Sequence, residues 1–401
     1  MPPFRNRKYM EKLTLIATTA FGLEAVTARE IENLGYTDKS VENGRVTFRG
    51  DGAAVARTNM FLRTADRVLI KVGEFHATSF EELFQGVKAL PWEDYLPADA
   101  CFPVTGRSVR SGLFSVSDCQ AITKKAIVER LKTKYSYVGD ILPENGATYK
   151  IEVGLLNDMA TLTIDTTGAG LNKRGYRRLA GPAPLKETMA CALIDLTFWK
   201  PGRILVDPLC GSGTIPIEAA MKELCIAPGL KRDFIYQTWK NFDSKYYDIA
   251  KEEADDLRIR PTGKTEIYGS DLDPKAVELA KLHAKEAEVD EFITLKQMNF
   301  KDLYSKEQFG FIITNPPYGE RLLDKDAAIQ LCRDMGRVFR RLENWSYYII
   351  TSDSGFEKHF GQKSEKNRKL YNGRLECHYY QYPSKVKPPK KHELSDITEE
   401  K

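Results

Sequence analysis

The chemistry of this sequence centres on Asn315-Pro316-Pro317-Tyr318, which follows the short apolar run 309–314. Two consecutive prolines cannot continue a central strand, so the run predicts a strand that ends at Asn315. The side-chain carbonyl of Asn315 and the backbone carbonyl of Pro316 would then be two fixed acceptors, suited to an exocyclic amino group. Tyr318 adds a flat face for stacking on a nucleobase. The plain alternative is a strand that stops at a proline-rich loop.

A glycine loop lies upstream of this motif, after the predicted strand 203–207. It consists of Asp207-Pro208-Leu209-Cys210-Gly211-Ser212-Gly213-Thr214. Glycines at such a loop let a ligand approach the backbone closely at a helix N-terminus. The loop has neither the third glycine of a dinucleotide site nor the lysine of a P-loop, and Asp207 disfavours a pyrophosphate. These features favour an uncharged or cationic ligand, such as an amino-acid moiety.

Two further strand ends carry polar side chains. Asp271, followed by Leu272, ends the predicted strand 266–271, and a carboxylate there can accept both hydroxyls of a ribose. Asn299 and Phe300 follow the predicted strand 293–298, where they would flank an adenine. Asp273, just before a proline, fits a helix cap as well as a ligand contact. Because ligands bind at the carboxyl ends of strands in open α/β sheets, we expect all four segments to line one site.

The elements that must position these residues begin at residue 185, where strands and helices alternate. This rhythm predicts an α/β fold with a seven-stranded, mostly parallel, doubly wound sheet. The Asn372-Gly373 turn predicts a final hairpin, which places an antiparallel strand near one edge. A long insertion, 226–262, separates the first helix from the second strand.

The N-terminal half reads as two α+β units, 1–75 and 76–167. The second unit contains predicted helices at 80–90 and 117–134, a strand at 100–105 and a hairpin around Asn157-Asp158. Residues 168–184 are rich in Gly, Pro and Arg, which predicts a linker, and 185–383 form the doubly wound domain. The polar tail 384–401 is predicted to be disordered.

Two basic stretches suggest contacts with RNA. Residues 101–134 are locally basic, and the linker combines cations with an embedded tyrosine. Such sets suit phosphate contacts and a stacked base. A solvated helix face and an ordinary basic linker are the alternatives. The candidate RNA-binding residues are Arg107, Arg110, Lys124, Lys125, Lys173, Arg174, Tyr176 and Arg177.

Composition narrows the class of protein. The 401 residues carry a net charge of +4, which by itself favours no partner. The sequence shows no apolar run long enough for a membrane helix and no signal peptide, so we expect no membrane association. The seven cysteines form no metal-binding spacing, which predicts reduced thiols in a cytoplasmic protein and no metal site.

The strand-end motifs together resemble those of class I S-adenosylmethionine-dependent methyltransferases. The extended motif Asn315-Pro-Pro-Tyr-Gly-Glu-Arg is similar to that of RNA guanine-N2 methyltransferases, above all the bacterial large-subunit rRNA enzymes of the RlmL type. The N-terminal half resembles their ferredoxin-like region and THUMP RNA-binding domain. Lys173-Arg-Gly-Tyr-Arg and Leu185-Lys-Glu-Thr also match, so the resemblance spans about residues 13–383.

The resemblance implies a Rossmann-like methyltransferase domain, S-adenosylmethionine as cofactor and an RNA substrate, rRNA first and tRNA second. Asn315, Pro316, Pro317 and Tyr318 would be catalytic, and Asn315 would also border the cofactor. The residues expected to bind the cofactor are Asp207, Pro208, Cys210, Gly211, Ser212, Gly213, Thr214, Asp271, Leu272, Asn299 and Phe300.

Some alternatives remain open within this resemblance. The position of Asn299 is often Asp in the family, which leaves its adenine contact in doubt. Glu320 and Arg321 would shape the base pocket or brace the loop. The Asn-Pro-Pro-Tyr motif also occurs in adenine-N6 and glutamine-N5 methylases. A tRNA guanine-N2 or adenine-N6 methyltransferase, and a non-catalytic RNA-binding assembly factor, are therefore the competing hypotheses.

Overall fold

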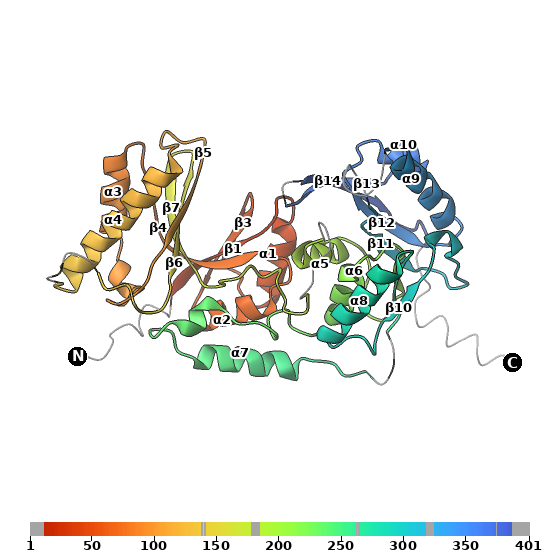
Figure 1. The fold of residues 1–401 in the computed structure, drawn as a ribbon, viewed down its shortest axis with the longest axis horizontal. Helices are drawn as coiled ribbons and strands as arrows, with labels where there is room; N and C mark the ends of the chain where they lie inside the picture. Colours follow the sequence, from red (N-terminus) through yellow and green to blue (C-terminus); the bar gives the residue numbers. More distant parts are fainter. Residues whose placement is uncertain are drawn as a thin grey trace. The chain divides into compact units, whose positions relative to one another are not determined.

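The computed structural model describes residues 12–137, 139, 142–177, 185–261, 263, 265–317, 325–373 and 375–386. They form two compact units, coloured along the chain in Figure 1. The N-terminal unit comprises 12–19, Leu23–Arg174 and Ala227–Leu257, and the C-terminal unit comprises the rest. The predicted disordered tail lies outside the described residues from position 387 onward.

One continuous seven-stranded sheet forms the N-terminal unit, in the order β2-β3-β1-β4-β7-β6-β5. The long strand β4 pairs with β1 on one side and β7 on the other, so it joins the two α+β units that the sequence predicted. All neighbours are antiparallel except β5 and β6. The strands are β1 (Leu13–Thr18), β2 (Lys39–Glu42), β3 (Arg45–Gly50), β4 (Arg67–His76), β5 (Val104–Val109), β6 (Lys150–Leu156) and β7 (Met159–Asp165).

Two helices of this unit begin at recognisable capping residues. Asp51 accepts a hydrogen bond from the Ala54 N–H at the start of α2, and Ser79 forms a capping box with Glu82 at the start of α3. The helices are α1 (Glu24–Asn33), α2 (Gly52–Phe61), α3 (Phe80–Ala89), η2 (Trp92–Asp94), α4 (Val116–Lys134), η3 (Ile235–Thr238) and α7 (Lys245–Asp256).

The predicted strand at 100–105 is wrong in position. Strand β5 instead covers Val104–Val109, and Cys101 makes only an isolated bridge to Thr148. The apolar residues on which the prediction of a strand at 100–105 depended include Phe102, which packs in the core without belonging to a strand. Strand β5 lies at the edge of the sheet and has no fully buried side chain, so it lacks the apolar pattern of a core strand.

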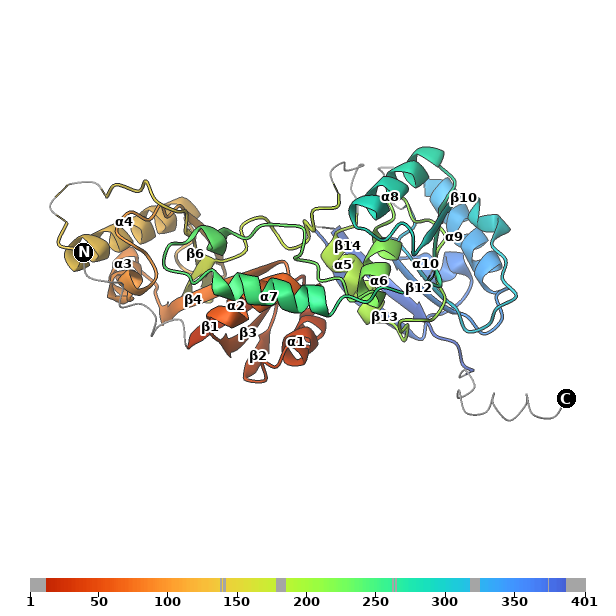
Figure 2. The same cartoon turned by 90° about the horizontal axis from the view of Figure 1, so that it is seen from below.

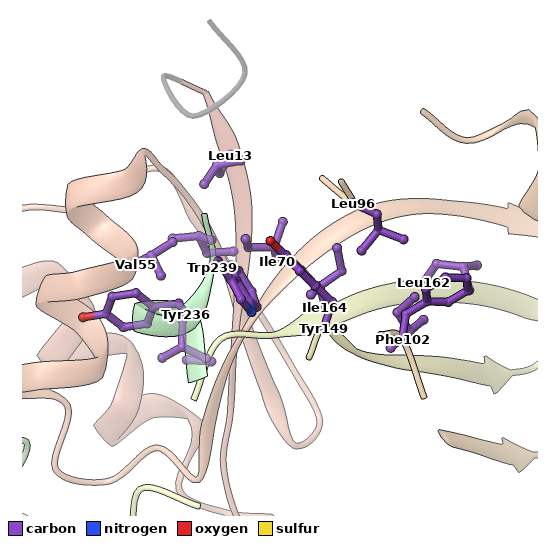
Figure 3. Packing of buried hydrophobic residues seen from close by; sticks show 14 of the residues in the cluster. Leu13, Val55, Ile70, Leu96, Phe102, Tyr149, Leu162, Ile164, Tyr236 and Trp239 are labelled. Atoms are coloured by element: carbon purple, nitrogen blue, oxygen red, sulfur yellow. The ribbon is translucent and has the colours of Figure 1, made fainter. Parts of the chain in front are cut away.

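The insertion after α6 belongs, by its contacts, to the N-terminal unit. Residues Ala227–Leu257 cluster with that unit, and their helix α7 packs against α2, as both views show (Figures 1 and 2). Trp239 stacks on Tyr149, with ring centroids 4.6 Å apart, and its indole N–H donates to the Thr148 carbonyl. Figure 3 shows Trp239 and Tyr236 of the insertion among the core side chains around Ile70 and Ile164.

The C-terminal unit is the predicted doubly wound sheet, in the order β10-β9-β8-β11-β12-β14-β13. The first five strands in this order are parallel, and the hairpin β13–β14 adds two antiparallel pairs. The seven-stranded, mostly parallel fold is thereby confirmed. Its strands are β8 (Leu205–Asp207), β9 (Ile267–Asp271), β10 (Thr294–Gln297), β11 (Phe311–Thr314), β12 (Ser346–Thr351), β13 (Lys366–Asn372) and β14 (Leu375–Tyr382).

Helices connect these parallel strands. The chain proceeds from β8 outward to β10 and then returns to β11 on the other side of β8, so the order of strands reverses there. Such a reversal opens a crevice at the carboxyl ends of the two strands, which is the usual ligand site of this architecture. The helices are α5 (Glu187–Asp195), α6 (Thr214–Glu223), α8 (Pro274–Glu286), η4 (Phe300–Asp302), α9 (Lys325–Phe339) and α10 (Phe356–Phe360). No helix in the described parts of the chain is long and apolar enough to cross a membrane.

Candidate active site

The carboxyl ends of β8 and β11 bring Asp207 and Asn315 to the point where the strand order reverses. The Thr314 hydroxyl donates a 2.7 Å hydrogen bond to Asp207 Oδ1, and the Leu209 N–H donates to the same oxygen at 3.2 Å. Asp207 is buried, and this burial raises the pKa of its carboxyl to about 7. Asp207 forms no ion pair with a cation among the described residues, and such a buried carboxylate is suited to a positively charged ligand group.

The glycine loop takes backbone conformations that favour glycine. Gly211 has φ +52° and Gly213 has φ +80°. A Cβ on Gly213 would lie 2.9 Å from the Ala280 Cβ of α8, so this glycine permits close packing of the loop on that helix. A Cβ on Gly211 would meet no atom within 4 Å, so open space lies in front of it. The loop therefore offers a ligand direct access to its backbone.

Asp271 holds the loop from the neighbouring strand β9. Its Oδ2 accepts from the Gly211 N–H at 2.9 Å, and its Oδ1 accepts from the Asp273 N–H at 3.0 Å. Each carboxylate oxygen keeps acceptor capacity for a ligand hydroxyl. Asp273 caps α8 through the Lys275 N–H, which favours the capping role over a ligand contact. Leu272 is exposed beside this carboxylate.

Asn315 has a buried hydrogen-bond acceptor that a ligand could use. Its side-chain carbonyl oxygen, Oδ1, is buried and has no hydrogen-bond partner among the described residues. Leaving a buried acceptor unpaired costs about 1–3 kcal/mol, so its retention needs a reason. Pro316 is buried and Pro317 half-buried beside it. Tyr318, Glu320 and Arg321, which the sequence also singled out, lie outside the described residues.

The remaining cofactor candidates occupy the same edge of the sheet. Asn299 Oδ1 accepts a hydrogen bond from the Lys301 N–H and caps η4, so this side-chain carbonyl already has a structural role. Phe300 is buried. Cys210 is buried in the loop, and burial raises the pKa of its thiol well above the ordinary value. The loop also contains Pro208, Ser212 and Thr214, of which Thr214 begins α6.

These observations fit S-adenosylmethionine. The open backbone at Gly211 and the buried carboxylate of Asp207 suit its amino-acid part, and Asp271 suits a ribose. Among the described residues, no group of three or more His, Cys, Asp or Glu side chains is arranged to hold a metal ion.

The candidate RNA-binding residues of the N-terminal unit fall into two groups. Arg107, Arg110, Lys125 and Lys173 are exposed. Lys124 is half-buried instead, since its Nζ lies 2.6 Å from Glu144 Oε2 and donates to the Phe102 carbonyl. Arg107 is exposed but lies 3.2 Å from the Glu152 carboxylate, so three of these five cations are exposed and have no ion pair among the described residues.

Three linker residues are reinterpreted, because the structure buries Arg174 and Tyr176 and leaves Arg177 only partly exposed. Arg174 donates hydrogen bonds to the carbonyls of Leu171 and Arg63. Tyr176 donates to Glu218, and Arg177 is ion-paired with Glu187. These contacts give Arg174, Tyr176 and Arg177 internal roles, so we remove them from the predicted RNA surface.

Sequence reasoning missed two residues that shape the site. Thr314 orients the Asp207 carboxyl, and its only signal was its position just before Asn315. His283, on α8, lies with Nδ1 3.1 Å from the Ser212 carbonyl and is buried. Nothing in its local sequence distinguished it from an ordinary helix residue.

Three family models cover most of the chain. A model described as "RMKL-like, methyltransferase domain" matches residues 174–381, the "RlmL ferredoxin-like domain" matches 14–69 and the "THUMP domain" matches 77–165. These matches confirm the predicted architecture of ferredoxin-like, THUMP and methyltransferase parts.

Two known proteins resemble the chain over nearly all of its length. YpsC of Bacillus subtilis, an RNA methyltransferase by name, is 48% identical over 95% of this chain and 99% of its own. The ribosomal RNA large subunit methyltransferase K/L of Psychromonas ingrahamii is 32% identical over 94% of this chain. The match spans 51% of that longer protein.

Two solved structures are similar in fold and sequence. SMU.472, named as a methyltransferase and solved with S-adenosylhomocysteine (SAH), is 46% identical, with TM-score 0.89 over 94% of this chain and 100% of its own. A Listeria monocytogenes protein, named as a predicted N6-adenine-specific DNA methylase, is 51% identical, with TM-score 0.88 over 94% of this chain and 97% of its own.

Proposed function

Because this chain belongs to the RMKL-like methyltransferase family, whose cofactor is S-adenosylmethionine, we propose that it methylates the exocyclic N2 of a guanine in 23S rRNA. The methyltransferase activity follows from the family. The guanine and the ribosomal RNA are the proposed part.

One observation carries the proposal, namely that the buried Oδ1 of Asn315 has no hydrogen-bond partner among the described residues at the cofactor edge of the sheet. An exocyclic amino group supplies the N–H donors that this oxygen lacks. The adjacent carbonyl of Pro316 offers a second acceptor on the same rigid segment. Two fixed acceptors would orient the nitrogen lone pair toward the reacting methyl group.

The residues of the chain act chiefly by positioning. S-adenosylmethionine, when bound, supplies an electrophilic methyl group. Asp207 and the backbone of the glycine loop would hold its methionine part, and Asp271 its ribose. The target guanine must leave its stack, at a cost of a few kcal/mol. No strong base is required, because the methylated nitrogen becomes cationic and releases its proton readily.

The exposed cations and the THUMP domain of the N-terminal unit favour an RNA substrate. The K/L relative is named for ribosomal RNA of the large subunit, which favours rRNA over tRNA. All seven cysteines are free thiols, which fits the reducing cytoplasm where we place the reaction.

Mass spectrometry of nucleosides tests the base and the RNA together. We expect a strain without this gene to lose N2-methylguanosine from 23S rRNA, relative to its parent, and the purified protein to restore it. Loss from tRNA alone would move the substrate to tRNA. The name of the Listeria protein makes adenine-N6 the second candidate, and loss of N6-methyladenosine with intact methylguanosine would favour it.

A further inference from the structure

Two linker side chains with no assigned part in methylation contact the helix that follows the glycine loop. Tyr176 and Arg177 both belong to the C-terminal unit, and Tyr176 is only 2% exposed. Their partners Glu218 and Thr214 lie one turn apart on α6, so the two side chains contact the same stretch of this helix.

Arg177 contacts two separate segments, the start of α6 and residues 185–187. Its guanidinium donates to the hydroxyl of Thr214, the first residue of α6, and donates to the Leu185 carbonyl at 3.1 Å. It also lies 3.3 Å from the carboxylate of Glu187, at the start of α5. Both charged side chains are at most 10% exposed, so this pair is held away from bulk water.

Tyr176 contributes to a second buried contact one turn further along α6. Its hydroxyl donates to Glu218 Oε1 at 3.0 Å, and the Cys191 thiol donates to Glu218 Oε2 at 2.9 Å. Glu218 is completely buried. The carboxylate of Glu218 therefore depends on donors from both the linker and α5.

The glycine loop ends where these contacts begin. Gly213 is the residue before Thr214, and its N–H donates to the Cys210 carbonyl, which closes the loop. On the other side, His283 fixes the Ser212 carbonyl. A shift of the first turn of α6 would therefore displace the backbone that faces the open space at Gly211.

We propose that Tyr176 and Arg177 are positioning residues of the cofactor site, which fix the glycine loop through the first two turns of α6. The proposal replaces the RNA contact that the sequence suggested for these residues. It rests on the S-adenosylmethionine cofactor of the family and is independent of which base is methylated.

Binding of SAH to the full-length protein, measured by calorimetry, tests the proposal directly. Tyr176→Phe removes only one hydroxyl, and Arg177→Lys keeps the charge while it loses the forked geometry. We expect both to weaken SAH binding about tenfold, as for a lost buried hydrogen bond, with RNA affinity unchanged. Arg177→Ala should weaken SAH binding further than Arg177→Lys.

Lys173→Ala is the matched control, because Lys173 belongs to the same motif but is exposed. It should reduce RNA affinity and leave SAH affinity unchanged. Wild-type SAH affinity in folded Tyr176→Phe and Arg177→Lys proteins would overturn the proposal, whether or not their melting temperatures fall. Loss of RNA affinity alone in these variants would also overturn it and restore the RNA-binding role. Neither result depends on the methylated nucleoside, so a wrong base assignment would be recognised separately.

Discussion

The buried carboxylate of Asp207 should destabilise the ligand-free protein, and we expect this effect in the pH dependence of the free energy of unfolding. Burial raises the pKa of this carboxyl to about 7, far above the ordinary value near 4. The folded state therefore binds more protons than the unfolded state between about pH 4 and 7. The free energy of unfolding should fall as pH rises through this window and level off above it.

Asp207→Asn should remove this dependence. At pH 8 we expect the ligand-free variant to exceed the wild type by on the order of 2–4 kcal/mol, with a much smaller gain at pH 5. Urea unfolding at the two pH values measures both differences. Asp302→Asn, which changes an exposed carboxylate of the same unit, should leave the pH dependence unchanged. A wild-type pH profile in Asp207→Asn would contradict the assignment.

Asn315 should affect catalysis and leave binding nearly intact. Asn315→Ala removes the buried acceptor Oδ1, which no described residue pairs, so we expect methyl transfer to fall at least about a hundredfold, comparable to the loss of one transition-state hydrogen bond. Asn315→Asp keeps an acceptor oxygen and should retain more activity. Single-turnover transfer of a labelled methyl group, with RNA binding measured in parallel, separates the two effects. If the Asn315→Ala protein still methylates RNA, the proposed hydrogen bond between Asn315 and the amino group is ruled out.

At the residue scale, the sequence was informative where chemistry needs a backbone constraint. Gly211 and Gly213 could be selected because few other residues tolerate a positive φ, and Asn315 could be selected because two prolines end the buried strand that precedes it. Arg177 and Tyr176 could not be assigned correctly, since a basic motif looks the same whether it faces a phosphate or a buried carboxylate. Only the burial of Glu187 and Glu218 distinguishes the two.

At the scale of elements, the insertion 227–257 should stabilise the N-terminal unit. Trp239 is buried against Tyr149, so Trp239→Ala should cost about 3–5 kcal/mol. In thermal unfolding, the variant should show a transition at a lower temperature than the wild type. At temperatures below that transition, the C-terminal unit should still bind SAH. Phe114→Ala is the matched control, because Phe114 lies in the same unit but is 84% exposed. Equal melting temperatures for both variants would show that the insertion adds no stability.

The sequence pattern predicted strands well where they are buried on one face or on both. The hairpin β6–β7 and the strands β8 and β11 lie within a residue or two of their expected positions. The predicted position of strand β5 was wrong because this edge strand has no fully buried side chain, and therefore no apolar pattern that marks it in the sequence. The insertion could be located by its length, yet its packing partner depends on contacts between Trp239 and residues far away in sequence.

At the scale of the whole molecule, fewer cations are free to contact RNA than the count of Lys and Arg in the basic stretch suggests. Arg130 and Lys134 both pair with Glu93, and Lys124 with Glu144, so these cations of α4 are compensated internally. The basic stretch predicted from sequence is thus smaller on the folded surface. The candidate RNA-binding residues that remain exposed are Arg107, Arg110, Lys125 and, in the linker, Lys173, of which Arg107 pairs with Glu152.

Neutralising these four residues together should therefore reduce both RNA affinity and its salt dependence. Each phosphate contact contributes about 0.7–0.9 to the slope of log K against log salt concentration, so the slope should fall by up to about three units. Filter binding across a salt series measures the slope. A control with Lys245, Lys251, Lys285 and Lys363 replaced by Ala has the same change in net charge and exposed positions. If both quadruple variants lose the same slope, RNA responds to overall charge, and the assigned surface is wrong.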